Sequence, residues 1–164
     1  MPSDLMTLSL TGRTTTPASI DAVELRCIQT SDRDALATAY LAAYPPGVAA
    51  TSLNDARQEM DDTFTGEFGA LRHDLTRVAT FEDRPIGAIL VVGKSIWDPQ
   101  LHGPFIIDLF VHPDVRGMGV GRALLDDAVH ACARAEDATL SLRVGEGTSP
   151  AALALYTRAG FQQR

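Results

Sequence analysis

Three alternating glycines, Gly117, Gly119 and Gly121, are the residues whose type and spacing point most directly to chemistry. An apolar segment ends shortly before them, and an amphipathic helical pattern begins directly behind them. Glycine lets successive backbone N–H groups converge without obstruction by a Cβ atom. The first turn of a helix adds unpaired N–H groups and the positive end of its dipole. The turn therefore predicts an anion cradle suited to a pyrophosphate, with contacts from Arg116, Gly117, Met118, Gly119, Val120, Gly121 and Arg122.

Other glycine-rich loops fit this stretch less well. A P-loop needs the pattern G-x-x-x-x-G-K-[ST], and no lysine follows these glycines. A dinucleotide-binding fingerprint would need a small residue where the sequence has Arg122 or Leu124, depending on which glycine starts it. A tight turn without a ligand is the remaining alternative, and it is disfavoured because three glycines destabilise a helix start without compensation.

Asp108 is the only charged residue in the apolar segment 105–111, FIIDLFV. A desolvated carboxylate has a raised pKa, which suits a group that takes a proton directly or through a water. The alternative is a buried structural carboxylate held by backbone donors or an arginine. Glu59, Glu67 and His73 are weaker candidates for a base. The sequence shows no convincing Ser/His/Asp or Cys/His set and no metal-ligand spacing, so no metal is expected.

Two motifs in order carry a family resemblance. Arg116, Gly119 and Gly121 match the pattern Q/R-x-x-G-x-G/A, within the flanks LFVHPDVRG and RALLDDAV. Downstream, the segment from Ser149 to Phe161 is similar to N-x-x-A-x-x-L-Y-x-x-x-G-F. With both, the sequence resembles the GCN5-related N-acetyltransferase (GNAT) family, strongly over 105–161 and compatibly over 23–104. The resemblance implies acetyl-CoA as co-substrate and direct attack by an amine in a ternary complex.

The resemblance also implies roles for single residues. Tyr156 occupies the general-acid position, where its phenol would protonate the departing CoA sulfur; its alternative role is to fill the core. Backbone amides at Phe110 and Val111 would hold the pantetheine arm and polarise the thioester carbonyl. Ser149 stands where the family commonly has an asparagine that contacts the cofactor, so this contact is a departure from the pattern.

The acceptor carries no motif of its own. The net charge of −7 argues against a nucleic-acid partner. Residues 51–69 contain five acidic side chains against Arg57 alone, which indicates either a solvated helix face or a funnel for a cationic substrate. We therefore expect a small cationic amine in preference to a protein N-terminus or lysine. The rival from another class is a non-catalytic acyl-CoA-binding or sensing module.

The elements that must position these residues follow from the hydrophobic periodicity. Residues 1–22, rich in Ser, Thr and Pro, are predicted to be a tail, and 23–164 one acetyltransferase domain. Strands are predicted at 23–28, 76–81, 86–92, 105–111 and 140–144, and helices at 31–43, 52–64, 120–135 and 150–159. The cysteines, Cys27 and Cys132, are expected to be buried free thiols.

The resemblance implies an α/β, three-layer acyl-CoA N-acyltransferase fold, with a mixed, mostly antiparallel central sheet flanked by helices. Only three residues follow Phe161, so the C-terminal strands are expected to be shortened. The sheet edge would then be missing, covered by the tail, or supplied by a second copy in a homodimer. No apolar run is long enough for a membrane span and the start does not read as a secretory signal, so a cytoplasmic protein is expected.

Overall fold

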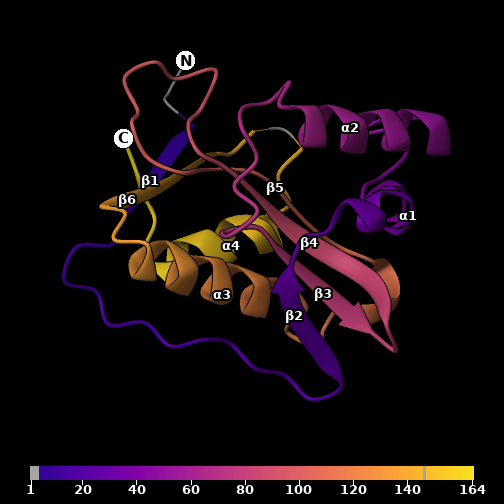
Figure 1. Cartoon of the computed structure of the whole chain (residues 1–164), viewed down its shortest axis with the longest axis horizontal. Helices are drawn as coiled ribbons and strands as arrows, with labels where there is room; N and C mark the ends of the chain where they lie inside the picture. Colours follow the sequence, from indigo (N-terminus) through magenta and orange to yellow (C-terminus); the bar gives the residue numbers. More distant parts are fainter. Residues whose placement is uncertain (1–3, 146) are drawn as a thin grey trace.

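One seven-stranded sheet, in the order β2-β3-β4-β5-β6-β1-β7, forms the middle layer of the protein (Figure 1). The structure is a computed structural model and describes residues 4–145 and 147–164. Its strands are β1 (Leu5–Ser9), β2 (Val23–Cys27), β3 (Arg77–Phe81), β4 (Arg84–Val92), β5 (Phe105–Val111), β6 (Thr139–Arg143) and β7 (Gln162–Gln163). Its helices are α1 (Arg33–Ala43), α2 (Leu53–Thr65), α3 (Val120–Arg134) and α4 (Pro150–Ala159), with short 3-10 turns at Thr30–Asp32 and Pro113–Val115.

Two hydrophobic cores lie on opposite faces of this sheet. On one face, α1 and α2 pack over β3, β4 and β5 around buried Leu36, Met60 and Phe110. On the other face, α3 and α4 pack around residues such as Leu124 and Tyr156. Every pair of neighbouring strands is antiparallel except β5 and β6, which are parallel. The predicted mixed, mostly antiparallel sheet flanked by helices is therefore confirmed.

The N-terminal segment contributes a strand, so the prediction of a tail over 1–22 is wrong for Leu5–Ser9. β1 lies between β6 and β7, pairing Leu8 with Leu140 and Met6 with Gln163. Leu5, Met6 and Leu8 are buried, and this burial offsets the conformational entropy lost when the segment becomes ordered. The apolar residues of this strand are too few to give a detectable periodicity, and Ser- and Thr-rich sequence surrounds them. Of the three ways to complete the edge beside β6, the N-terminal segment is the one observed.

β5 and β6 diverge after a short contact. Their parallel pairing covers only Phe105 with Ser141 and Ile106 with Leu142, so the rest of β5 continues without β6 beside it. The pairing of β5 with β4 also shifts, because Leu90 pairs with Asp108 and Val91 with Ile106. Ile107 is left over as a β-bulge, and a bulge turns two successive side chains to the same face of a sheet. Ile107 and Asp108 accordingly both line one cavity under α2.

The cysteines are free, as predicted, but only one of them is buried. Cys132, on α3, is buried in the core, whereas Cys27, predicted to be buried, is exposed at the end of the edge strand β2. No described helix combines the length and the apolar character that a membrane crossing requires.

Candidate functional site

The glycine turn before α3 has the geometry of an open cradle. Gly117 and Gly119 have φ angles of +83° and +80°, in the left-handed region that favours glycine. A Cβ atom added to either would meet nothing within 4 Å, so the space in front of the turn is open. The backbone N–H groups of residues 117 to 122 donate to no acceptor in the described part of the chain. These donors converge where the α3 dipole is positive, as an anion site requires.

The side chains around the turn divide into two groups. Arg116 donates to the Ala43 carbonyl at the end of α1, which holds its guanidinium beside that helix. Arg122 is exposed, with Nε 3.7 Å from the Oδ2 of Asp126, and Met118 is also exposed. The Val120 side chain is buried, so only its N–H can face a ligand. The sequence prediction therefore identifies the right segment, but the contacts it offers are mainly backbone.

The divergence of β5 from β6 leaves strand amides free. The His112 N–H donates to the Ile86 carbonyl at 2.7 Å. Because hydrogen-bonded and non-hydrogen-bonded pairs alternate in antiparallel strands, the Phe110 N–H is directed at β4 and the Val111 N–H points away from it. Of the two predicted amides, Val111 is thus the one that faces the gap between β5 and β6.

Ser149 is committed to another interaction. Its Oγ accepts a hydrogen bond from the Ala152 N–H at 3.1 Å and caps α4, with Pro150 in the first turn. The helix then ends at Gly160, whose φ angle is +106°. The predicted cofactor contact of Ser149 has no support from its side-chain geometry, which is that of a helix cap.

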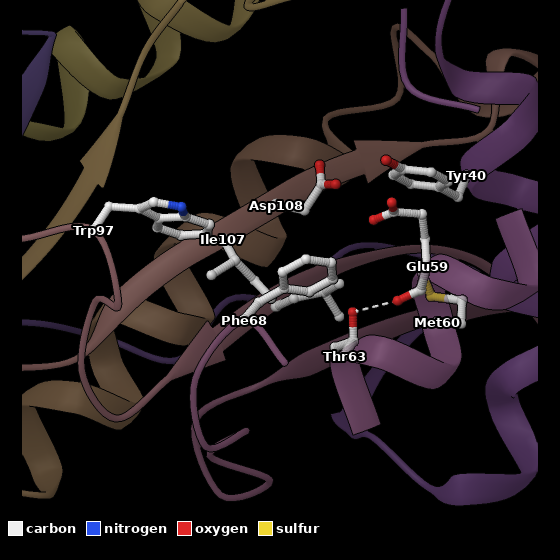
Figure 2. Close-up of a pocket in the computed structure, with 9 residues that line it drawn as sticks. Tyr40, Glu59, Met60, Thr63, Phe68, Trp97, Ile107 and Asp108 are labelled. Atoms are coloured by element: carbon white, nitrogen blue, oxygen red, sulfur yellow. Dashed lines mark hydrogen bonds between the residues drawn. The ribbon is translucent and has the colours of Figure 1, made fainter. Parts of the chain in front are cut away.

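A cavity of about 180 Å³ lies between α1, α2 and the bulge of β5 (Figure 2). Its acidic and hydroxyl-bearing side chains come from three separate elements, as Figure 2 shows for Tyr40, Glu59 and Asp108. The lining residues are Tyr40, Glu59, Met60, Thr63, Phe68, Leu90, Trp97, Ile107 and Asp108. The cavity can therefore hold a small molecule with its polar group at two carboxylates.

Asp108 is held by a tyrosine that the sequence analysis did not single out. The Tyr44 hydroxyl donates to Asp108 Oδ1. Desolvation raises the pKa of Asp108 to about 6, although the hydrogen bond from Tyr44 opposes that rise and the charge of Glu59 adds to it. Desolvation also raises the pKa of Glu59, with smaller contributions from Asp62 and Asp55. The carboxylate at position 108 is thus poised to exchange a proton near neutral pH.

Tyr156 combines both of the roles considered for it. Its ring is buried in the core and packs edge-on against Phe161, with 5.9 Å between centroids. Its hydroxyl makes no hydrogen bond within the described residues. Burial raises its pKa, and so does the charge of Asp108, which places the two groups within electrostatic reach. The phenol therefore keeps its proton at neutral pH and has a donor to offer.

Of the three weaker candidates for the base, only one lines the cavity. Glu59 reaches the cavity, whereas Glu67 and His73 are exposed outside its lining, and the His73 ring lies 6.3 Å from that of Phe64. Residues 4–145 and 147–164 contain no group of three or more His, Cys, Asp or Glu side chains placed to hold a metal ion. Four residues that line or support the cavity were not predicted from the sequence, namely Tyr40, Tyr44, Phe68 and Trp97. The available signal was the spacing of Tyr40 and Tyr44 across the end of the first predicted helix, where the structure places Tyr44 at the C-cap of α1.

Residues 72–163 match the model of the acetyltransferase (GNAT) domain family, which is more than half of the chain. The chain belongs to the GNAT family. Among solved structures, a GCN5-related N-acetyltransferase from Sphaerobacter thermophilus superposes with a TM-score of 0.71 at 18% identity, covering 100% of this chain and 50% of that protein. The chain thus spans half the length of that relative.

Two further GNAT-fold neighbours are more similar in length. The ribosomal-protein-S18-alanine N-acetyltransferase from Escherichia coli matches with a TM-score of 0.64 and 21% identity, covering 87% of this chain and 79% of that one. An agmatine N-acetyltransferase matches with a TM-score of 0.63 and 19% identity, covering 87% and 83%. At these identities the neighbours establish the fold alone, and it is the predicted GNAT fold. No curated protein matches the chain.

The GNAT family generally uses acetyl-CoA, and the residues present fit it. The open cradle at Gly117 and Gly119 offers uncommitted N–H donors to a pyrophosphate. The Val111 amide faces the gap beside β6, where an extended arm could pair with the exposed strand edge. Family membership supports acetyltransferase activity in general.

Proposed function

We propose that this protein is an N-acetyltransferase that transfers the acetyl group of acetyl-CoA to a small cationic primary amine. The observation that carries the proposal is the meeting of Asp108, Tyr44 and Tyr156 where β5 leaves β6. Asp108, which lines the cavity, is a proton acceptor with a pKa of about 6, and Tyr156, within electrostatic reach of it, is a protonated phenol. Acyl transfer to an amine needs both groups at one place.

The chain's own residues would hold acetyl-CoA along one continuous path. The N–H groups of residues 117 to 122 would bind the pyrophosphate, with Arg122 adding positive charge. The Val111 amide would hold the pantetheine arm and polarise the thioester carbonyl. When bound, the co-substrate supplies an acetyl group activated as a thioester.

Asp108 would prepare the acceptor for attack. An aliphatic amine is protonated at neutral pH and has no free electron pair until it loses a proton. The Asp108 carboxylate, with its pKa of about 6, is mostly ionised at pH 7 and takes that proton directly or through a water. Glu59, in the same cavity, adds negative charge that attracts the ammonium form.

Tyr156 would act at the other end of the transfer. A C–N bond forms as the C–S bond breaks; the ammonium gives up one proton before attack and another after it, and the departing sulfur takes one. The Tyr156 hydroxyl, uncommitted to any acceptor in the described chain and with a raised pKa, supplies the proton for the sulfur. One proton is released per turnover, and no covalent enzyme intermediate is needed.

The cavity supports a small acceptor in preference to a polypeptide. About 180 Å³ bounded by two helices and the bulge accommodates a compact amine. A peptide substrate would instead need an extended groove to hold its backbone. The charged end of the cavity agrees with the excess of acidic residues over 51–69, of which Glu59 is one.

Two measurements test the proposal together. Calorimetry gives the affinity for CoA, and thiol release from acetyl-CoA is followed across small amines, peptides with free N-termini and peptides containing lysine. We expect CoA to bind at micromolar affinity and small amines to give the highest turnover. Binding of CoA without turnover on any amine or peptide would instead establish the acyl-CoA-sensing alternative.

A further inference from the structure

The acceptor cavity has two chemically different ends. Figure 2 shows Asp108, Glu59 and Tyr40 gathered on one side, with Trp97 separated from them on the other. The lining residues toward Trp97 are apolar, as with Ile107 and Phe68. A ligand that spans the cavity therefore meets charge at one end and rings at the other.

Glu59 marks the charged end. Its carboxylate makes no hydrogen bond or ion pair within the described residues, although other acidic residues of α2 do, such as Asp61 with Arg33 at 2.7 Å. It points toward Asp108 and Tyr40 (Figure 2), and its charge contributes to the raised pKa values of both. An unpaired carboxylate that is half-buried in a cavity favours a cationic ligand.

Trp97 marks the apolar end and is the only tryptophan of the chain. Its side chain is 52% exposed, and its ring lies 6.0 Å from that of Phe105. A half-exposed indole that lines a cavity offers a flat face to an apolar or aromatic group. The cavity lining has no carboxylate at this end to pair with a second cation.

A buried polar cluster fixes the loop that carries Trp97. Asp98 is 1% exposed, and Arg143 at the end of β6 donates to it from Nε at 3.0 and 3.1 Å and also from Nη2. Ser95 donates to Asp98 at 2.8 Å and accepts from the Trp97 N–H at 3.1 Å. The backbone that carries the indole is thus tied to β6 through a charge-assisted network.

We infer that the acceptor is a primary amine on a short apolar body, with an aromatic body preferred. Its ammonium binds between Glu59 and Asp108, and its body lies against Trp97. Asp98 and Arg143 act as positioning residues for that indole. This inference rests on the proposed function and narrows its acceptor class, because a diamine would place a second charge at the end without carboxylates.

Turnover on three amines tests the class. We expect kcat/KM to be about tenfold higher for 2-phenylethylamine than for 1,4-diaminobutane, with butylamine between them, since an aromatic contact is worth about that factor. Trp97→Ala should raise the KM for 2-phenylethylamine about tenfold and the KM for butylamine less, and Trp97→Phe should restore most of the preference. The matched control is Ile96→Ala, because Ile96 is equally exposed but does not line the cavity. A preference for 1,4-diaminobutane, or equal losses for all three amines, would overturn the inference.

Binding to the single tryptophan separates failure of the inference from failure of the proposed function. Titrating 2-phenylethylamine into the protein with CoA present should change Trp97 fluorescence whether or not turnover occurs. Glu59→Gln should raise the apparent Kd about tenfold, as expected for a lost charge-assisted contact, and exposed Glu67→Gln should not. If the amine leaves Trp97 emission unchanged, or if Glu59→Gln leaves the Kd for 2-phenylethylamine unchanged, the proposed subsite is wrong even when some amine is acetylated. A binding signal without turnover would instead remove the enzymatic proposal.

The positioning role has its own readout. Arg143→Gln and Asp98→Asn should expose Trp97 further, seen as red-shifted emission and stronger acrylamide quenching in the free protein. KM for 2-phenylethylamine should rise several-fold while kcat is kept. Arg134→Gln is the control, since Arg134 is exposed at the end of α3 away from the cluster. A fall in kcat for every amine, or an unchanged emission spectrum, would contradict the positioning role.

Discussion

The glycine cradle before α3 and the acceptor cavity between α1, α2 and β5 are built on opposite principles. The cradle consists of consecutive residues and presents mainly backbone N–H groups. The cavity is lined by side chains from α1, α2, β4, the bulge of β5 and two loops, which are far apart along the chain. A backbone site tolerates many side chains and suits a co-substrate shared by a whole family. A side-chain site can change one residue at a time, which suits an acceptor that differs between relatives.

This difference has a functional consequence. Changes in the cradle should alter affinity for CoA and leave the ranking of amines intact, because none of the residues that line the cavity belongs to the turn. Changes in the cavity should alter proton transfer or acceptor preference and leave CoA binding intact. The following predictions test that separation, in order of decreasing expected effect.

Asp108→Asn should give the largest effect. We expect kcat to fall by about 10³, within the usual contribution of a general base, with the Kd for CoA unchanged. The variant should also be more stable to heat, and more so at pH 8 than at pH 5. The pKa of Asp108 is about 6 in the folded protein and 3.8 in the unfolded chain, so the folded state binds its proton more tightly. The native protein therefore loses stability as the pH rises from about 4 to about 6, whereas the variant, with a neutral side chain at this position, does not. Thermal unfolding at both pH values checks this, with exposed Asp126→Asn as control; a less stable variant at pH 8 would contradict the argument.

Tyr156→Phe should lower kcat about 100-fold through loss of the proton donor. Its melting temperature should stay within about 2 °C, because the hydroxyl makes no hydrogen bond in the described chain and the ring keeps its place against Phe161. Tyr40→Phe is the matched control, since that ring is also buried but its hydroxyl lies in the cavity, where it should change KM at most. Steady-state kinetics and CoA calorimetry decide, and an unchanged kcat in Tyr156→Phe would remove the tyrosine from its role.

Gly119→Ala addresses the cradle. A methyl group at φ +80° costs about 1 kcal/mol, which should lower the melting temperature by about 2–4 °C. It also projects into the open space of the cradle, so the Kd for CoA should rise on the order of tenfold while relative kcat/KM values among amines stay the same. Gly12→Ala is the control: its φ is +71° and its Cβ likewise meets nothing within 4 Å. It should lose similar stability without losing affinity for CoA.

The contrast between the two regions also explains what could be predicted from the sequence. The cradle was predictable because its residues are consecutive, and the sheet and its flanking helices followed from periodicity and from a family resemblance. The cavity was not, because the bulge that turns Ile107 and Asp108 to one face leaves no mark in FIIDLFV. Trp97 lies in an irregular loop whose position depends on a distant arginine in β6. β1 was missed for a related reason, since its three apolar residues, Leu5, Met6 and Leu8, are buried only after β6 and β7 exist to pair with them.

The smallest predicted effect is also the most specific, because two neighbours of Asp108 should move its titration in opposite directions. Tyr44→Phe removes a hydrogen bond that lowers the carboxyl pKa, so the acidic limb of kcat/KM against pH should move up by about one pH unit. Glu59→Gln removes a charge that raises the same pKa, so that limb should move down. The ionisation of the amine itself is common to all three proteins and cancels in the comparison. A general loosening of the cavity would move the acidic limb in the same direction in both variants. That result would show that a group other than Asp108 takes the proton.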